Sequence, residues 1–271
     1  ETVEGPRIRE EPGPALVLRE GSPMTRPPIP AARRHLIDRL LDALVRVVAA
    51  LARTADRRLD ALGLAPPPLD LPPEVLDDLH AFFAGTVSPT AVTIRRGHVP
   101  GIPHPRAFAL PGLIYLGTDP GIVGIAGPAG SGVAGVAEPA SARGGIPGPV
   151  RARATPTLVH ELVHIWQGRF LGPRYVVRAL GEQIRLGRRA YDWRAALDRR
   201  GGLPVEAHAQ LVSEAYAARY GPPPFPALSR REEHLRAVEE VLTGLHAGDA
   251  STLRGADGLG ADHVVVVPCL L

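Results

Sequence analysis

The sequence predicts a predominantly helical α+β protein, and two patterns carry this prediction. Segments rich in Leu, Val and Ala repeat their apolar residues at spacings of three and four, as amphipathic helices do. Short runs of β-branched and aromatic residues, bounded by Gly and Pro, lie between residues 91 and 116. With 271 residues, 45% of them hydrophobic, the chain can bury a sizeable core. We therefore expect a small β-sheet followed by helices.

The N-terminal part of the chain is predicted to be an arm followed by one long helix. Residues 1–30 are rich in Pro, Glu and Arg and are expected to be extended. From Ala31 to about Leu64 apolar residues recur at helical spacing, until three prolines end the pattern. The repeating positions are Leu36, Leu40, Leu41, Leu44, Val47, Val48 and Leu51. We expect this apolar side to cover a core; a membrane-surface or partner-binding helix is the alternative.

The rest of the chain divides at changes in composition. A short helix at about 73–83 completes an N-terminal helical region, 31–88. The main domain, 89–247, is expected to contain strands at 91–95, 107–110 and 113–116, a loop over 117–150, and helices at about 156–169, 173–187, 204–220 and 229–247. Residues 248–271 are expected to be a C-terminal tail, with a candidate strand at 263–268. The loop contains no P-loop motif and no well-placed G-x-G-x-x-G, so a phosphate cradle is not expected.

Composition and charge exclude several classes of function. All 31 basic residues are Arg, and the absence of Lys and Asn indicates a bacterial gene of very high GC content. The net charge is only +3, the Arg residues are dispersed and aromatic residues make up 4%, so no nucleic-acid partner is expected. The single cysteine, Cys269, excludes a multi-cysteine zinc site and an internal disulfide framework. No apolar run reaches the roughly 18 residues of a membrane span.

One motif carries chemistry, the pattern H-E-x-x-H from His160 to His164. On a helix, histidines four residues apart project from one face, so both imidazoles can bind one metal ion. Glu161 then lies at the edge of that face, where it can reach a water beside the ion as a general base. Chance gives roughly 0.02 occurrences of such a pattern in a chain of this composition. We therefore predict a zinc site here.

The residues around the motif predict the helix that it needs. Thr155 is a candidate N-cap, Pro156 suits the first helical position, and Gly168 follows the predicted last turn. The side opposite the histidines is apolar, with Val159, Leu162, Val163 and Trp166. We expect a half-buried helix whose histidines face a cleft.

A catalytic zinc site needs a third protein ligand and a fourth position for water. The downstream candidates are Glu182, Asp192, Glu206, His208 and Glu214. Glu206 is favoured because it lies early in a predicted helix, and His208 is the alternative. Glu214, two turns further on, is either an acceptor that orients a ligand histidine or a solvated helix position.

The segment from Val159 to Gln167 resembles the zincin-type core domain of bacterial proteins associated with extracellular contractile injection systems, and of Vgr-related proteins. Segments 107–116 and 191–193 resemble that family's aromatic strand pair and its Tyr-Asp-aromatic segment. Residues 206–212 resemble its Glu-Gln-Gln-Ala helix, with Ala207 and His208 in place of the Gln pair. The resemblance covers about residues 91–216. It implies a gluzincin-like minimal metallopeptidase fold, a zincin-like catalytic domain over 89–247 and Glu206 as the third zinc ligand.

The motif and the resemblance together predict a zinc-dependent metallopeptidase that acts on a peptide or protein substrate. Zn²⁺ is expected to be held by His160, His164 and Glu206, with Glu161 as the general base. Tyr191 is either a donor to the oxyanion of the tetrahedral intermediate or a packing aromatic. A metal hydrolase acting on another kind of amide would use the same geometry.

The alternative is a non-catalytic structural or cargo module of a bacterial injection or toxin system, with a structural or vestigial zinc site. The resemblance implies that the chain is secreted or injected by such a system, and otherwise cytoplasmic. No signal peptide is recognisable in the chain. Cys269 is either an inhibitory thiolate that reaches the zinc or a residue without a role.

Overall fold

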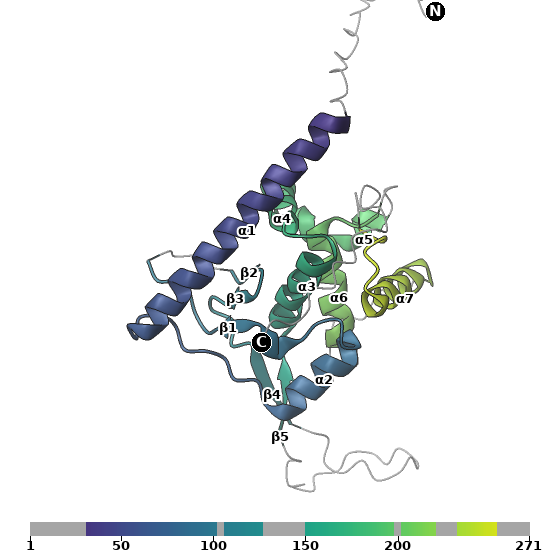
Figure 1. Ribbon diagram of the computed structural model, residues 1–271. Coiled ribbons are helices and arrows are strands. Elements are labelled where there is room, and N and C mark those ends of the chain that lie inside the picture. Colours follow the sequence, from purple (N-terminus) through teal and green to yellow (C-terminus); the bar gives the residue numbers. More distant parts are fainter. Residues whose placement is uncertain (1–30, 102–105, 127–149, 198–201, 221–231, 254–271) are drawn as a thin grey trace, which may run out of the picture.

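The protein is mixed α+β and predominantly helical, as predicted. A computed structural model describes residues 31–101, 106–126, 150–197, 202–220 and 232–253 (Figure 1). The helices are α1 (Ala31–Ala61), α2 (Pro73–Phe83), α3 (Pro156–Phe170), α4 (Tyr175–Leu186), α5 (Trp193–Leu197), α6 (Val205–Tyr220) and α7 (Glu232–Ala247), with 3-10 helices η1 (Pro89–Ala91) and η2 (Gly187–Tyr191). The strands are β1 (Thr93–Arg95), β2 (Phe108–Leu110), β3 (Leu113–Tyr115), β4 (Ile122–Ala126) and β5 (Val150–Ala154).

The first sheet confirms the strand pair predicted before the H-E-x-x-H helix. Its order is β1-β3-β2, with β2 antiparallel and β1 parallel to the central strand. The turn between β2 and β3 needs Gly112, whose φ of +79° lies in the left-handed region that side chains rarely adopt. Phe108 and Tyr115 stack across the pair with ring centroids 5.6 Å apart.

The second sheet was not predicted. β4, inside the expected loop over 117–150, pairs antiparallel with β5, from Ile122 opposite Ala154 to Ala126 opposite Val150. The loop prediction is therefore wrong for β4, because glycine and alanine weaken the local strand signal while the partner strand supplies the pairing. β5 is tied in turn to α2, where Asp78 forms ion pairs with Arg151 and Arg153.

The long helix α1 packs with a different face from the one predicted. Val45 and Ala49 are buried, whereas most of the predicted apolar side is 47–64% exposed in the described part of the chain. The exposed positions are Leu36, Leu40, Leu44, Val47, Val48 and Leu51. Polar contacts add to this packing on the same face as Val45 and Ala49, including Arg53 to the carbonyl of Pro111 at 2.6 Å. None of the described helices is both long enough and apolar enough to cross a membrane.

The core lies around α3, which runs between the first sheet and α6 (Figure 1). Trp166 is fully buried, and its indole donates to the carbonyl of Leu245 at 3.1 Å, which ties α3 to the end of α7. Every residue from Leu158 to His164 is buried. The prediction of a half-buried helix is therefore wrong, because α4, α6 and β2 all pack against it.

Candidate metal centre

The N-cap of α3 fixes where its histidines begin. Thr155 Oγ1 accepts a hydrogen bond from the backbone N–H of Leu158 at 3.1 Å, as the sequence predicts. The same hydroxyl donates to Asp119 Oδ1 at 2.7 Å, and that carboxylate also accepts from the backbone N–H of Gly121 at 2.7 Å. The cap therefore joins the start of α3 to the segment between β3 and β4.

We expect Thr155→Ala to lower the free energy of unfolding by about 1–2 kcal/mol, because the helix loses its cap and Asp119 loses a donor. Urea denaturation of the purified protein measures this. The control is Thr157→Ala, which removes the same atoms from inside α3. Equal losses in the two variants would contradict the role of the cap.

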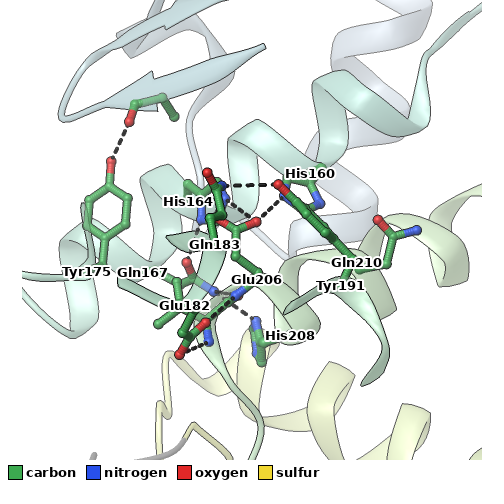
Figure 2. A network of polar contacts seen from close by, with 12 residues as sticks. His160, His164, Gln167, Tyr175, Glu182, Gln183, Tyr191, Glu206, His208 and Gln210 are labelled. Carbon is green, nitrogen blue, oxygen red and sulfur yellow. Dashed lines mark hydrogen bonds and ion pairs between the residues drawn. The ribbon is translucent and has the colours of Figure 1, made fainter. Parts of the chain in front are cut away.

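Three side chains, two from α3 and one from α6, converge on one point (Figure 2). His160 Nε2 lies 3.2 Å and His164 Nε2 3.6 Å from Glu206 Oε2, and the three donor atoms all lie within 4.8 Å of one another. His160 and His164 come from adjacent turns of α3, and Glu206 comes from the first turn of α6. Their exposed fractions are 8%, 6% and 1%. This buried group could hold a metal ion.

The charges of the group suit a cation. Burial would raise the pKa of Glu206, but hydrogen bonds from the two histidines outweigh it and hold that pKa well below its usual range. Burial would lower the pKa of His164, but the bond and charge of Glu206 raise it to about 9. Burial lowers the pKa of His160. A proton on His164 thus balances the buried carboxylate, and a divalent ion with affinity for imidazole and carboxylate ligands can take its place.

Gln167 determines which ring nitrogen of His164 is available to a metal ion. Its Nε2 donates to the carbonyl of Val205 at 2.9 Å, which can only accept, so its Oε1 faces His164 Nδ1 at 2.7 Å. The proton on His164 Nδ1 therefore points to Gln167, and Nε2 is the nitrogen available to an ion. This hydrogen bond also fixes the plane of the ring. Tyr175, which donates to the carbonyl of Ala109 at 3.2 Å, stacks on the same imidazole with centroids 5.8 Å apart.

His208, the alternative third ligand, lies behind Gln167 and is not part of the group. Its Nδ1 is 3.3 Å from Gln167 Nε2, and its ring stacks on Trp166 with centroids 5.6 Å apart. Burial, with a contribution from the two histidines of the group, lowers the pKa of His208 to about 3. The ring is neutral at ordinary pH, and it accepts the amide proton of Gln167.

The other acidic candidates have separate roles. Glu182 accepts from the backbone N–H groups of Val205 and Glu206, both at 3.2 Å, and so caps α6. Asp192 Oδ1 accepts from the backbone N–H of Ala195 at 3.0 Å at the start of α5. Neither carboxylate belongs to the metal-binding group found among the described residues.

Glu214 matches neither of its predicted roles. It accepts hydrogen bonds from Trp193 at 3.0 Å, from Arg194 at 2.9 Å and from Gln210 at 3.1 Å. Glu214 thus holds α5 against α6. Gln210, one turn after Glu206, donates its amide N–H to Glu214 and not to a ligand histidine.

Tyr191 reaches the group through Gln183 (Figure 2). Gln183 Nε2 donates to Tyr191 Oη at 3.0 Å and to Glu206 Oε1 at 2.7 Å. Burial raises the pKa of Tyr191 to about 12, so the phenol keeps its proton at neutral pH. The rings of Tyr191 and His160 lie 5.8 Å apart. The structure therefore brings Tyr191 to the edge of the group.

Glu161 is buried beside the two histidines. It is 5% exposed, and its Oε2 has no hydrogen-bond partner among the residues that the structure describes. Burial raises the pKa of Glu161 to about 7. A buried acceptor without a partner costs about 1–3 kcal/mol, and Glu161 carries this cost beside the metal-binding group.

Sequence reasoning named Glu182 only as a candidate ligand and missed Gln167, Gln183 and Tyr175. Gln167 lies one turn after His164, and this spacing was the one available signal. Gln183 and Tyr175 belong to α4, and no local pattern connects them with α3.

Three predicted features lie outside the described residues: the extended arm over 1–30, the strand at 263–268 and Cys269. No family model, no curated protein and no solved structure matches the chain. The grounds for a functional site are therefore the geometry and charge of five side chains from α3, α6 and η2. They are His160, Glu161, His164, Tyr191 and Glu206.

Proposed function

We propose that the chain is a zinc-dependent metallopeptidase that hydrolyses peptide bonds. The observation that carries the proposal is the convergence of His160, His164 and Glu206, whose donor atoms lie within 4.8 Å of one another. Two imidazoles and one carboxylate, with a fourth position for water, are the ligands of catalytic zinc in several metallopeptidases. The carboxylate comes from a second helix packed on the H-E-x-x-H helix, which supports a gluzincin-like arrangement.

A zinc ion held by these ligands would polarise the scissile carbonyl and lower the pKa of a nearby water. Glu161 would accept the proton of the attacking water at Oε2, the buried atom without a partner in the described residues. The same carboxyl would then deliver the proton to the leaving amine.

Tyr191 would stabilise the charge that develops on the substrate carbonyl. Its phenol keeps the proton needed to donate, and Gln183 already donates to the phenol oxygen at 3.0 Å. Arg106 also hydrogen-bonds the phenol and can only donate, so the hydroxyl proton would be directed away from both partners and toward a substrate. Tyr191 thus has the role of oxyanion donor in the proposed mechanism.

Metal analysis tests the proposal first. We expect the purified protein to bind one zinc ion per chain and to cleave a quenched-fluorescent peptide library. His160→Ala should lose most of the bound zinc and nearly all of the hydrolysis, because one of three ligands is gone. His80→Ala, an exposed histidine at the end of α2, is the matched control.

Three outcomes separate the proposal from its competitors. Failure to bind zinc, or full zinc retention by His160→Ala, contradicts it. Zinc binding without any hydrolysis favours a structural or cargo module. Cleavage of small N-acyl amides but of no peptide favours a hydrolase with a non-peptide substrate.

A further inference from the structure

Gln183, on α4, contacts two members of the site with a single amide nitrogen. Nε2 lies 2.7 Å from Glu206 Oε1 and 3.0 Å from Tyr191 Oη. The carboxylate can only accept, so the amide must present its nitrogen, and its two hydrogens serve the two oxygens. Figure 2 shows the amide between the third ligand and the phenol.

The two carboxylate oxygens of Glu206 have different partners. Oε1 accepts from Gln183, while Oε2 faces Nε2 of His160 and Nε2 of His164. Glu206 is 1% exposed, and Glu182 accepts from its backbone N–H at 3.2 Å, so both the backbone and the side chain of Glu206 are held. Oε2 is therefore the oxygen that faces the position of an ion between the two histidines.

The contact also orients Tyr191. A phenol oxygen that accepts from Gln183 directs its own hydrogen away from that amide. Tyr191 lies on η2, outside the helices that carry the ligands, so this hydrogen bond links its hydroxyl to them.

We propose that Gln183 is a positioning residue that restricts Glu206 to one-oxygen ligation and turns the Tyr191 hydroxyl toward the substrate. This inference rests on the proposed function, but its first half concerns ion binding alone. Partners that orient metal ligands typically contribute 10- to 100-fold in affinity or activity.

The test replaces the amide by a side chain of similar length without a donor. Gln183→Met should weaken zinc binding by about 10- to 100-fold, measured by competition with a chromophoric chelator. In the cobalt(II)-loaded protein the visible absorption bands should change in position and intensity, because Glu206 can then bind with both oxygens. Gln210→Met is the control: Gln210 lies one turn beyond Glu206 and its amide donates to Glu214, so zinc affinity and cobalt spectrum should match the wild type.

The second half is tested by a double-mutant cycle on kcat. Tyr191→Phe should leave zinc affinity unchanged and lower kcat, and adding Gln183→Met should lower kcat by less than the product of the two single effects. Gln183→Asn, which keeps an amide but shortens the reach, repeats the measurements if Gln183→Met does not fold. Wild-type zinc affinity and cobalt spectrum in a folded Gln183 variant overturn the first half, and independent effects on kcat overturn the second.

The two proposals fail in different ways. A protein that binds zinc but cleaves no peptide overturns the proposed function and the proposed role of Gln183 toward Tyr191. Chelator competition and the cobalt spectrum still decide whether Gln183 restricts Glu206 to one-oxygen ligation. A protein that binds no divalent ion overturns both proposals.

Discussion

Glu161→Gln is expected to lower peptide hydrolysis by about 10²- to 10⁴-fold while the protein stays folded and keeps its zinc. The amide has the shape of the carboxylate but cannot take the proton of the attacking water. Glu161 is buried, and its Oε2 has no partner among the described residues, so no hydrogen bond to that atom is lost. Stability should not fall, because a buried ionisable group is replaced by a neutral one.

The measurement pairs kcat/KM on one cleaved peptide with zinc analysis of the same preparation. Glu161→Gln purified in the same way also reports any contaminating protease, because its residual rate sets an upper limit on that activity. A zinc-loaded Glu161→Gln protein that hydrolyses at the wild-type rate would contradict the general-base role and with it the peptidase proposal.

The local part of the site could be predicted because one helix holds it. His160, Glu161 and His164 follow from spacing on α3, and the cap and proline that start this helix adjoin it in the sequence. Helix geometry also explains why Glu206 and His208 are not both ligands. Residues two apart on a helix point about 200° away from each other, so when Glu206 faces the ion site His208 faces away.

The remainder depends on neighbours that periodicity does not specify. The amides of Gln167 and Gln183 matter through hydrogen bonds to residues on α6 and η2. The strand β4 exists through pairing with β5, across the intervening residues 127–149. In α1 the apolar spacing identifies one face of a helix, but the opposite face packs, with Val45 and Ala49 buried and Arg53 bonded to Pro111. Spacing predicts elements and single-helix motifs, whereas the contacts between elements require coordinates.

Hydrogen bonds and ion pairs between β1 and α1 predict a large loss of stability for Arg95→Met. Arg95, on β1, donates to both oxygens of Asp56 at 3.0 and 2.8 Å and to Asp60 at 2.7 Å. Tyr115 donates to the same carboxylate of Asp56 at 2.6 Å. The side chains of Arg95 and Asp56 are 3% and 5% exposed, so the variant leaves a buried carboxylate without its cation. We expect a loss of about 3–5 kcal/mol in the free energy of unfolding, measured in urea at pH 7.

The pH dependence of this loss separates the ion pair from packing. Burial alone would raise the pKa of Asp56, but hydrogen bonds from Arg95 and Tyr115 outweigh it and hold the pKa below its ordinary value of 3.8. The contribution of the pair is therefore complete above that value and is lost as the pH falls through the lowered pKa of the folded protein. The difference between wild type and Arg95→Met should shrink accordingly in acid. The control is Arg96→Met at the exposed neighbour, which should change the free energy of unfolding by less than about 0.5 kcal/mol. A loss in Arg96→Met similar to that in Arg95→Met would mean that the charge pair does not anchor α1. A difference between wild type and Arg95→Met that does not depend on pH would mean the same.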